Sequence, residues 1–348
     1  MNAHGQIVIE PQYFKVEDFH NGFSIVTFNN KPVPLDNLGR LLMKHLFNFV
    51  GKFKEQKARA RLVTKWGYID ERGSLAIDVQ FDQAGDFNEY LAAVKVGDKW
   101  GYINHDGDYI ITPQFFAAGQ FSNGIAPVMM EEEGQYGFID TKGKIVIPIG
   151  FDMAHPFQNS LAVVEIDGVY GYINTKGEVV VEPQFDIPAN PFFGQFKDGM
   201  AVVMQDNSYG YLKESGELIQ PPLYSYAGEF SDGLGLVKIN NKYGFLNKNA
   251  QLTIHPAYDN ASHFVDGLAA VQSNGKWGYI DKSGAQIIPF QYDSANPFRD
   301  NLALVENDDI WSYIDAKGEV IWQEALNESE SSFRNSDTAE NRRETSIS

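Results

Sequence analysis

The chain has 348 residues, of which 43% are hydrophobic and 14% aromatic, and this composition excludes a largely disordered polypeptide. The sequence contains no Cys, which excludes disulfides and thiolate chemistry. The net charge of −18 repels phosphate backbones, so nucleic acid is not an expected partner.

The sequence also bears on membranes and location. No uninterrupted apolar run reaches the roughly 18 residues that suggest a spanning helix, so no transmembrane segment is expected. Residues 1–13 lack the apolar core of a signal peptide, which makes the cytoplasm the default location. These residues resemble the middle of a repeat. In one interpretation the natural chain begins earlier, and the compartment therefore stays open.

An aromatic–glycine pair recurs along the chain and defines a repeat. The pairs are Trp66-Gly67, Trp100-Gly101, Tyr136-Gly137, Tyr170-Gly171, Tyr209-Gly210, Tyr243-Gly244 and Trp277-Gly278, followed by Trp311-Ser312. Successive anchors are 34, 36, 34, 39, 34, 34 and 34 residues apart. A fixed period of this size indicates a tandem repeat array with a continuous core.

Other positions keep the same phase and extend the array over residues 1–322. A glycine follows the anchor glycine by six residues in every repeat except one, where Ala250 follows Gly244, and this series reaches back to Gly5. The register predicts nine full periods and a partial one, with a truncated first repeat. The repeat near 31–65 is degenerate, with Pro32-Val33-Pro34 in place of the aromatic strand; a local helix within 40–57 is the alternative. Residues 323–348 are polar and predict a disordered tail.

Each period predicts three short strands, exemplified by residues 161–166, 169–173 and 178–182. Asp167-Gly168 between the first two has the residue types of a type I′ hairpin. The Asp/Asn-x-x-Gly pattern between the second and third predicts a type I turn. A proline such as Pro183 is expected to end the third strand, because it lacks an N–H group.

The middle strand is expected to carry the core aromatics. Residues two apart share a face, so Trp66 and Tyr68 point the same way and Gly67 the other. The glycine is expected to accept a side chain from the neighbouring repeat. The predicted fold is all-β: a tandem array of three-stranded antiparallel units of about 34 residues each. Because propellers usually have about 4–8 blades, an open, curved or superhelical solenoid is favoured, and a closed propeller-like toroid is the alternative.

The segments KWGYIDERG, KWGYINHDG and KWGYIDKSG, each followed by an apolar strand and an aromatic residue, resemble those of bacterial WG-repeat proteins, also called WG/KWG β-repeat proteins. The resemblance covers residues 1–322 and departs from the pattern at residues 32–34, Ala250 and Ser312. It implies the repeat architecture. The family has no agreed catalytic residues, so the resemblance transfers no site.

No catalytic, cofactor or metal site is predicted. The seven histidines form no HExxH spacing, and no nucleophile elbow or phosphate loop occurs. Asp70, Asp140, Asp281 and Asp315 fall at turn positions and are expected to form turns. The chain is therefore expected to be a non-enzymatic scaffold for proteins or other macromolecules. The alternatives are a repeat protein that binds carbohydrate or the cell envelope and, less favoured, a hydrolase with a carboxylate-lined groove.

Two stretches depart from the repeat pattern and are the candidate binding surfaces. Between residues 40 and 65, eight Lys and Arg residues are opposed only by Glu55, which suits an acidic partner or self-association. An insertion at 187–195 falls in a loop. The candidate partner-binding residues are Arg59, Arg61, Lys52, Lys54, Pro191, Phe192 and Phe193. The expected partner is a protein, with a glycan or the cell envelope as the alternative.

Overall fold

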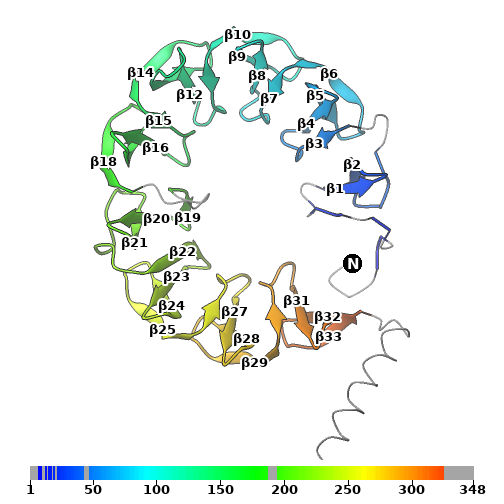
Figure 1. Cartoon of the computed structure of the whole chain (residues 1–348), viewed down its shortest axis with the longest axis vertical. Helices are drawn as coiled ribbons and strands as arrows, with labels where there is room; N and C mark the ends of the chain where they lie inside the picture. The colour runs from blue at the N-terminus through cyan, green and yellow to red at the C-terminus, as the bar shows by residue number, and fades with distance from the viewer. Residues whose placement is uncertain are drawn as a thin grey trace, which may run out of the picture. The chain divides into compact units, whose positions relative to one another are not determined.

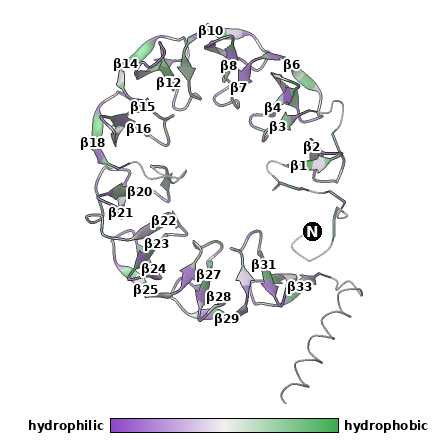
Figure 2. Cartoon of the chain, viewed as in Figure 1, coloured by the Kyte–Doolittle hydropathy of each residue, from purple (hydrophilic) through white to green (hydrophobic). Residues whose placement is uncertain are grey.

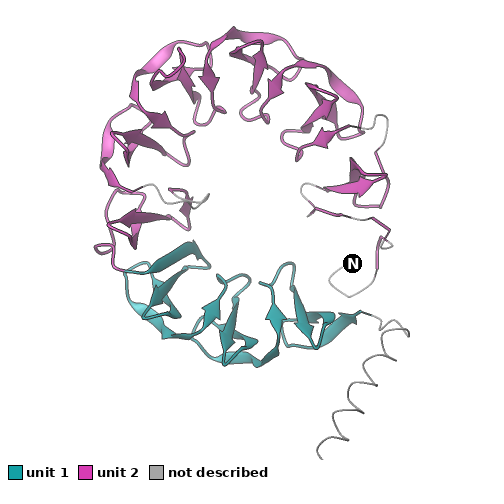
Figure 3. Ribbon diagram, viewed as in Figure 1, with its two compact units in different colours: residues 1–6, 224–348 teal, residues 7–223 magenta. Residues whose placement is uncertain are grey.

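The computed structural model describes residues 7–9, 12–13, 15–17, 19, 22–42, 47–186 and 194–324. The chain divides into two compact units, which are coloured separately in Figure 3. Unit 2 spans residues 7–223, and the described part of unit 1 spans residues 224–324. The placement of Pro191, Phe192 and Phe193, and of the tail beyond residue 324, lies outside the described residues.

All the regular structure in these ranges is β, as expected, and the helix considered for residues 40–57 does not form in the described part of that segment. The strands form separate antiparallel sheets in which sequence neighbours pair, and seven of the described sheets have four strands. Figure 1 shows these small sheets following one another within each unit. None of them closes into a barrel.

Unit 2 contains one two-stranded, four four-stranded and one three-stranded sheet. The strands are β1 (Phe23–Phe28) and β2 (Lys31–Asp36); β3 (Phe49–Val50), β4 (Lys57–Leu62), β5 (Lys65–Asp70) and β6 (Leu75–Phe81); β7 (Gln83–Ala84), β8 (Ala92–Val96), β9 (Lys99–Ile103) and β10 (Tyr109–Phe115); β11 (Ala117–Ala118), β12 (Ile125–Met129), β13 (Tyr136–Asp140) and β14 (Ile145–Phe151); β15 (Met153–Ala154), β16 (Leu161–Ile166), β17 (Val169–Asn174) and β18 (Val179–Phe185); β19 (Phe196–Lys197), β20 (Met200–Gln205) and β21 (Ser208–Lys213).

Unit 1 contains three four-stranded sheets in its described part. The strands are β22 (Tyr226–Ser231), β23 (Leu234–Ile239), β24 (Lys242–Asn247) and β25 (Leu252–Tyr258); β26 (Asn260–Ala261), β27 (Leu268–Ser273), β28 (Lys276–Asp281) and β29 (Gln286–Tyr292); β30 (Ser294–Ala295), β31 (Leu302–Asn307), β32 (Ile310–Asp315) and β33 (Val320–Gln323).

The expectation of three strands per repeat is wrong, because most of the sheets have four. The three predicted strands form, as β16, β17 and β18 show, but a two-residue strand, β15, precedes them and pairs with β16. Between β15 and β16 the chain makes a second tight turn. The equivalent turn before β12 is Asn123-Gly124, with positive φ angles of 57° and 75°. Asn-Gly and Asp-Gly are the strongest short hairpin signals, so this turn was visible in the sequence.

The predicted type I′ hairpins form in most repeats. Asp167-Gly168 has φ angles of 53° and 79°, and Asn240-Asn241 has 49° and 63°. The predicted Asp-x-x-Gly turns also form: the Asp281 Oδ1 atom accepts hydrogen bonds from the N–H groups of Ser283 and Ala285, at 2.9 and 3.0 Å. The degenerate repeat keeps the register too, because β2, which carries Pro32-Val33-Pro34, pairs with β1 across Asn29-Asn30.

Val63 departs from this turn chemistry and offers a test of it. It has a φ of 58°, a conformation that is unfavourable for a β-branched residue, and its side chain is 73% exposed. Asn tolerates this conformation and stands at the same turn position in Asn240 and Asn274. We expect Val63→Asn to raise the free energy of unfolding by about 0.5–1 kcal/mol, measured by urea denaturation. An unchanged or lower midpoint would contradict the expectation.

The anchor glycine faces the backbone of its own sheet, so the expected contact with a neighbouring repeat is wrong. A Cβ atom on Gly101 would lie 2.5 Å from the Ile111 carbonyl oxygen and 2.6 Å from Pro113 N, both in β10. The pairing of β9 with β10 slips here, because Tyr102 pairs with Ile111 but Trp100 pairs with Phe115. Pro113 does not end its strand, contrary to expectation. It lies within the bulge of β10, an outer strand of the sheet, where no partner strand needs an N–H group.

A different glycine makes the close approach between repeats. A Cβ atom on Gly107, in the turn between β9 and β10, would lie 3.2 Å from Ile77 Cγ2 in the preceding sheet. Gly143 stands in the same relation to Ile111, also at 3.2 Å. The positive φ of these turn glycines is thus combined with tight packing between sheets.

The core lies between consecutive sheets. Tyr68, Ile77 and Phe81 of one sheet pack against Val94 and Ile103 of the next, all of them at most 5% exposed. Tyr68 shares its face with Trp66, which packs at the margin of the same cluster, as expected. In Figure 2, hydrophobic residues occupy much of the fourth strands β6, β14 and β18, whose inward residues enter these cores.

The second aromatic of each anchor joins one sheet to the next. The Tyr102 hydroxyl donates a hydrogen bond of 2.7 Å to the Gly119 carbonyl oxygen, and its ring centroid lies 4.7 Å from that of Phe121. Tyr279 makes the same contacts with Asn296 and Phe298, at 2.8 and 4.8 Å. These two tyrosine ties each satisfy a buried hydroxyl and add an aromatic pair, whereas Phe138 and Phe245 at the same position make the ring contact alone.

Candidate binding groove

A groove of 650 Å³ opens in unit 2 where side chains of successive repeats meet. We call it the Arg61 groove. Its walls include Arg59, Arg61, Trp66, Asp86, Trp100 and Gln120, and Pro156 lies at one margin. These residues come from β4 and β5 and from the loops and strands of the next three sheets. No single repeat contributes all of its walls, so the groove is a product of stacking.

Arg59 occupies a position that is apolar in the other repeats. The strand pairing opposes it to Tyr68. The residues opposed to the equivalent aromatics are Ala93, Pro127, Val163, Val202, Leu236, Ala270 and Leu304. The sequence therefore introduces a charge where the fold otherwise has a hydrophobic residue.

The Arg59 side chain is tied to the next repeat. Its guanidinium donates a hydrogen bond of 3.1 Å to the Ala84 carbonyl oxygen, and Nε lies 2.9 Å from Asp86 Oδ1, an ion pair whose angles do not meet hydrogen-bond geometry. It also lies 5.6 Å from the centroid of the Trp66 ring. Arg59 is therefore chiefly a tie between sheets, and its charge is offset by Asp86.

Arg61 is held differently. Its guanidinium carbon lies 5.5 Å from the centroid of the Trp66 ring, within cation–π range. Its Nε is buried and has no hydrogen-bond partner among the described residues. A buried donor without a partner costs free energy. Arg61 therefore presents an oriented positive charge to the groove, and its Nε retains unused hydrogen-bonding capacity.

Asp82 closes one side of the groove and is fully engaged. Lys65 Nζ lies 2.6 Å from Asp82 Oδ1, and the Gly97 N–H donates to Oδ2 at 2.8 Å. These two hydrogen bonds, that of Lys65 being the larger influence, hold the pKa of Asp82 below its ordinary value. The carboxylate thus fixes a hairpin turn and the preceding sheet at the same time.

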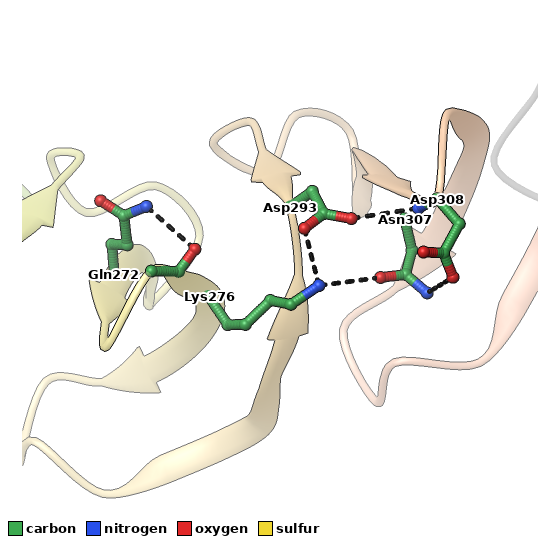
Figure 4. Close-up of polar contacts among 6 residues, drawn as sticks. Gln272, Lys276, Asp293, Asn307 and Asp308 are labelled. Atoms are coloured by element: carbon green, nitrogen blue, oxygen red, sulfur yellow. Dashed lines mark hydrogen bonds and ion pairs between the residues drawn. The ribbon is translucent and has the colours of Figure 1, made fainter. Parts of the chain in front are cut away.

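The same arrangement recurs in unit 1. Figure 4 shows Asp293 accepting from Lys276 Nζ at 2.6 Å and from the Asp308 N–H at 3.0 Å. Lys276 also reaches Asn307 Oδ1 at 3.5 Å, and Gln272 bonds the carbonyl oxygen of its own hairpin. Two of the three KWG segments have an Asp 17 residues after their lysine, so the pairs Lys65–Asp82 and Lys276–Asp293 carry a signal in the sequence; Lys99 has Phe116 at that distance.

The Tyr68 hydroxyl lies beneath the groove. It donates a hydrogen bond of 2.8 Å to the Gly85 carbonyl oxygen. Burial, with a smaller contribution from the Asp86 charge, raises the pKa of Tyr68 well above its ordinary value. Tyr68 therefore remains a neutral structural group.

The structure brings only some of the predicted binding residues together. Arg59 and Arg61 line the groove beside two anchor aromatics, Trp66 and Trp100. Lys52 and Lys54 are exposed and lie near the turn before β4, apart from the groove walls. Tyr136, Tyr209, Tyr243, Trp277 and Trp311 are half-buried in their own sheets, whereas Tyr170 is buried.

Sequence reasoning missed Asp82, Asp86 and Gln120 as parts of the groove. Gln120 is exposed, and Asp86 and Gln120 occupy the same position of successive short-strand loops. The residue at that position differs from repeat to repeat. A polar residue there cannot be distinguished, in the sequence, from an ordinary loop residue. Only the pairing of Arg59 with Asp86 in three dimensions reveals them.

The sheets and their ties define a class of protein: an all-β tandem repeat protein built from four-stranded antiparallel meanders. The chain belongs to the WG-containing repeat family. The family model matches residues 1–31, 66–100, 100–133, 136–170, 170–209, 209–243, 243–277 and 277–309. It leaves out residues 32–65, the degenerate repeat that holds Arg59 and Arg61.

Solved structures with a similar fold are distant in sequence. A crystal structure of a eukaryotic initiation factor is 11% identical, with 87% of this chain and 96% of that chain covered and a TM-score of 0.53. Hsv2p of Kluyveromyces lactis is 11% identical over 70% of this chain and 97% of its own, with a TM-score of 0.36. The dihydro-heme d1 dehydrogenase NirN in complex with DHE is 11% identical over 91% and 76%, with a TM-score of 0.40. The likeness to the initiation factor shows the fold alone, and the other two, with TM-scores below 0.5, carry no conclusion.

No curated protein matches the chain. No helix in the described part of the chain is long and apolar enough to cross a membrane.

Proposed function

We propose that the chain is a non-enzymatic scaffold that binds a protein partner in the Arg61 groove. The observation that carries this proposal is Arg61 itself: a guanidinium positioned on Trp66, with a buried Nε that has no partner among the described residues. Arg and Trp are enriched among residues that dominate binding energy at protein interfaces. The groove also draws on several repeats, as extended repeat surfaces do.

The carboxylates of the groove favour binding over hydrolysis. Hydrolysis by paired carboxylates needs one acid that keeps its proton near neutral pH. Asp82 has its pKa lowered by Lys65 and Gly97, and Asp86 is paired with Arg59. The surroundings of Asp82 thus favour its charged form, and the Asp86 carboxylate is occupied by an ion pair.

Carbohydrate binding is the second candidate, and a specific observation supports it. Trp66, Trp100 and Trp277 are half-buried, so part of each side chain remains accessible. A glycan array separates this candidate from the first. Glycan binding that is lost on replacing Trp100 by Ala would favour carbohydrate as the ligand.

A photo-crosslinking experiment tests the protein scaffold. A photoreactive amino acid at Gln120, an exposed residue of the groove, is introduced into the full chain in its native cells. The matched control carries the same group at Gln286, which is exposed in unit 1. We expect a discrete crosslinked protein from Gln120 only, and its loss in Arg61→Gln. Identical adduct patterns from the two positions would exclude the groove as a protein-binding site.

We further propose an open, curved array, with a closed toroid as the alternative. The sequence register gives nine full periods and a partial one, whereas propellers usually close with about 4–8 blades. Small-angle X-ray scattering of the full chain tests this proposal. A scattering profile with the minima of a ring would contradict the open array.

A further inference from the structure

The Arg61 groove gathers cations in an acidic protein, because Arg59 and Arg61 line it and Lys65 and Lys95 lie beside its wall residue Asp82. Two of these cations, Arg59 and Lys65, are paired with the groove residues Asp86 and Asp82. Arg61 has no such ion pair within the described part of the chain, and Lys95 is close enough to Asp82 to contribute to the lowering of its pKa. The whole chain has a net charge of −18. A local positive potential in such a background attracts anions selectively.

Stacking on Trp66 prepares Arg61 for a carboxylate. The planar guanidinium matches a carboxylate with two parallel hydrogen bonds, and stacking limits the rotamers it would otherwise lose on binding. The equivalent residues in the other repeats are Lys95, Met129, Glu165, Met204, Lys238, Gln272 and Glu306. Arg61 is the only guanidinium at this position among the described repeats.

The face of Trp66 distinguishes between classes of anionic ligand. Sugar rings bind by stacking on a bare aromatic face, but the guanidinium groups of Arg59 and Arg61 lie 5.6 and 5.5 Å from the Trp66 ring centroid. The two guanidinium groups therefore occupy the Trp66 ring face that a sugar ring would need. Trp100, further along the groove, has no such cation–π contact among the described residues and can accept an apolar side chain.

The size of the groove suits a short peptide segment. Its 650 Å³ lies within the range of about 300–1,000 Å³ that holds a drug-sized ligand. Asp82 and Asp86 flank the cations and oppose a doubly charged phosphate more strongly than a single carboxylate.

We infer that the Arg61 groove binds an acidic peptide segment of a partner protein, with a Glu or Asp carboxylate on Arg61 and an adjacent apolar side chain against Trp100. This inference rests on the proposed scaffold function and specifies the partner's chemistry. The carboxylate supplies an acceptor for the half-buried Arg61 guanidinium, and the apolar neighbour covers Trp100.

Isothermal titration calorimetry with the full chain tests the inference. The probe is a capped pentapeptide of alternating leucine and glutamate, and its counterpart has glutamine in place of glutamate. We expect the glutamate peptide to bind about 10- to 100-fold more tightly, as a charge-assisted hydrogen bond allows. The difference should vanish in Arg61→Gln, return in part in Arg61→Lys, and decrease as salt is added.

Lys238→Gln is the matched control, because Lys238 stacks on Tyr243 at 5.0 Å in the equivalent position of unit 1. It should leave peptide binding unchanged, and thermal melts establish that each variant is folded. Equal binding of the two peptides, or no binding of the glutamate peptide at millimolar concentration, overturns the inference. Tighter binding of oligogalacturonate or inorganic phosphate overturns it in favour of an acidic glycan or a phosphate.

The two proposals fail in different ways. If Gln120 still crosslinks a protein but the peptides bind equally, the scaffold function stands and the acidic-segment inference falls. If no protein crosslinks at Gln120, the scaffold function itself fails.

Discussion

Replacing Gly101 by Ala should lower the free energy of unfolding by about 3 kcal/mol, the upper part of the usual range for overpacking. The added Cβ would lie 2.5 Å from the Ile111 carbonyl oxygen and 2.6 Å from Pro113 N. Both are backbone atoms of the paired strand, so no side chain can rotate away. The bulge in β10 would have to move, and with it Phe115, which is 1% exposed in the core. Urea denaturation followed by circular dichroism measures the loss.

Gly150→Ala is the control for the loss of glycine as such. A Cβ atom there would have no heavy atom within 4 Å, and Gly150 lies in β14, another fourth strand of unit 2. The control should differ from the parent by no more than a few tenths of a kcal/mol. Equal denaturation midpoints for the two variants would show that the anchor glycine is not selected by close packing.

Phe121→Ala should destabilise unit 2 by about 3–5 kcal/mol, the range for removal of a buried Phe side chain. Phe121 is fully buried, and its ring centroid lies 4.7 Å from that of Tyr102 in the preceding sheet. The change removes the aromatic tie between the sheet β7–β10 and the sheet β11–β14. Because each repeat is stabilised by its neighbours, the interface should weaken more than the sheets themselves.

Hydrogen exchange read by mass spectrometry shows where this loss occurs. Amides of β8–β9 and β12–β13, on either side of the tie, should exchange faster, whereas those of β27–β28 in unit 1 should be unchanged. Tyr90→Ala is the matched aromatic control, since Tyr90 is 73% exposed. Uniform acceleration across all strands would contradict a local interface and indicate a single cooperative unit.

Much of the fold was accessible from the sequence because its signals recur in phase. The anchor pairs placed the third strand of most sheets, and the Asp-x-x-Gly pattern placed the turn that follows it. The degenerate repeat was found by register alone, although the family model does not match residues 32–65. Periodicity compensates for the weakness of each single signal.

The errors have identifiable physical causes. A two-residue strand such as β11 has too few residues to show alternation, so only its Asn123-Gly124 turn could reveal it. The role of the turn glycine was assigned to the anchor glycine. A glycine in a sequence indicates that another group comes close, but it does not show which group. Gly101 faces its own sheet and Gly107 faces the preceding sheet. The proline was assigned to the end of a strand because a proline is compatible with a strand end and with a bulge alike. Nothing else in the sequence indicates a bulge.

The candidate groove was predictable only in part. The excess of positive charge singled out Arg59 and Arg61, but could not separate a tie between sheets from a residue available to a ligand. That distinction depends on Asp86, 27 residues beyond Arg59 in the sequence and 2.9 Å from its Nε in space. Lys52 and Lys54 share the charge but not the location. The insertion residues Pro191, Phe192 and Phe193 remain a prediction.

The spacing of the ties between sheets has a consequence for how the chain acquires its structure. All-β proteins usually fold slowly, because strands far apart in sequence must find one another. Here every strand of a sheet pairs with a sequence neighbour, and Tyr102 finds its partners at Gly119 and Phe121, only 17 and 19 residues ahead. Each sheet can form and dock as soon as the next half-period has left the ribosome. Synthesis can therefore proceed in step with folding, and few unpaired strand edges are exposed to aggregation while translation continues.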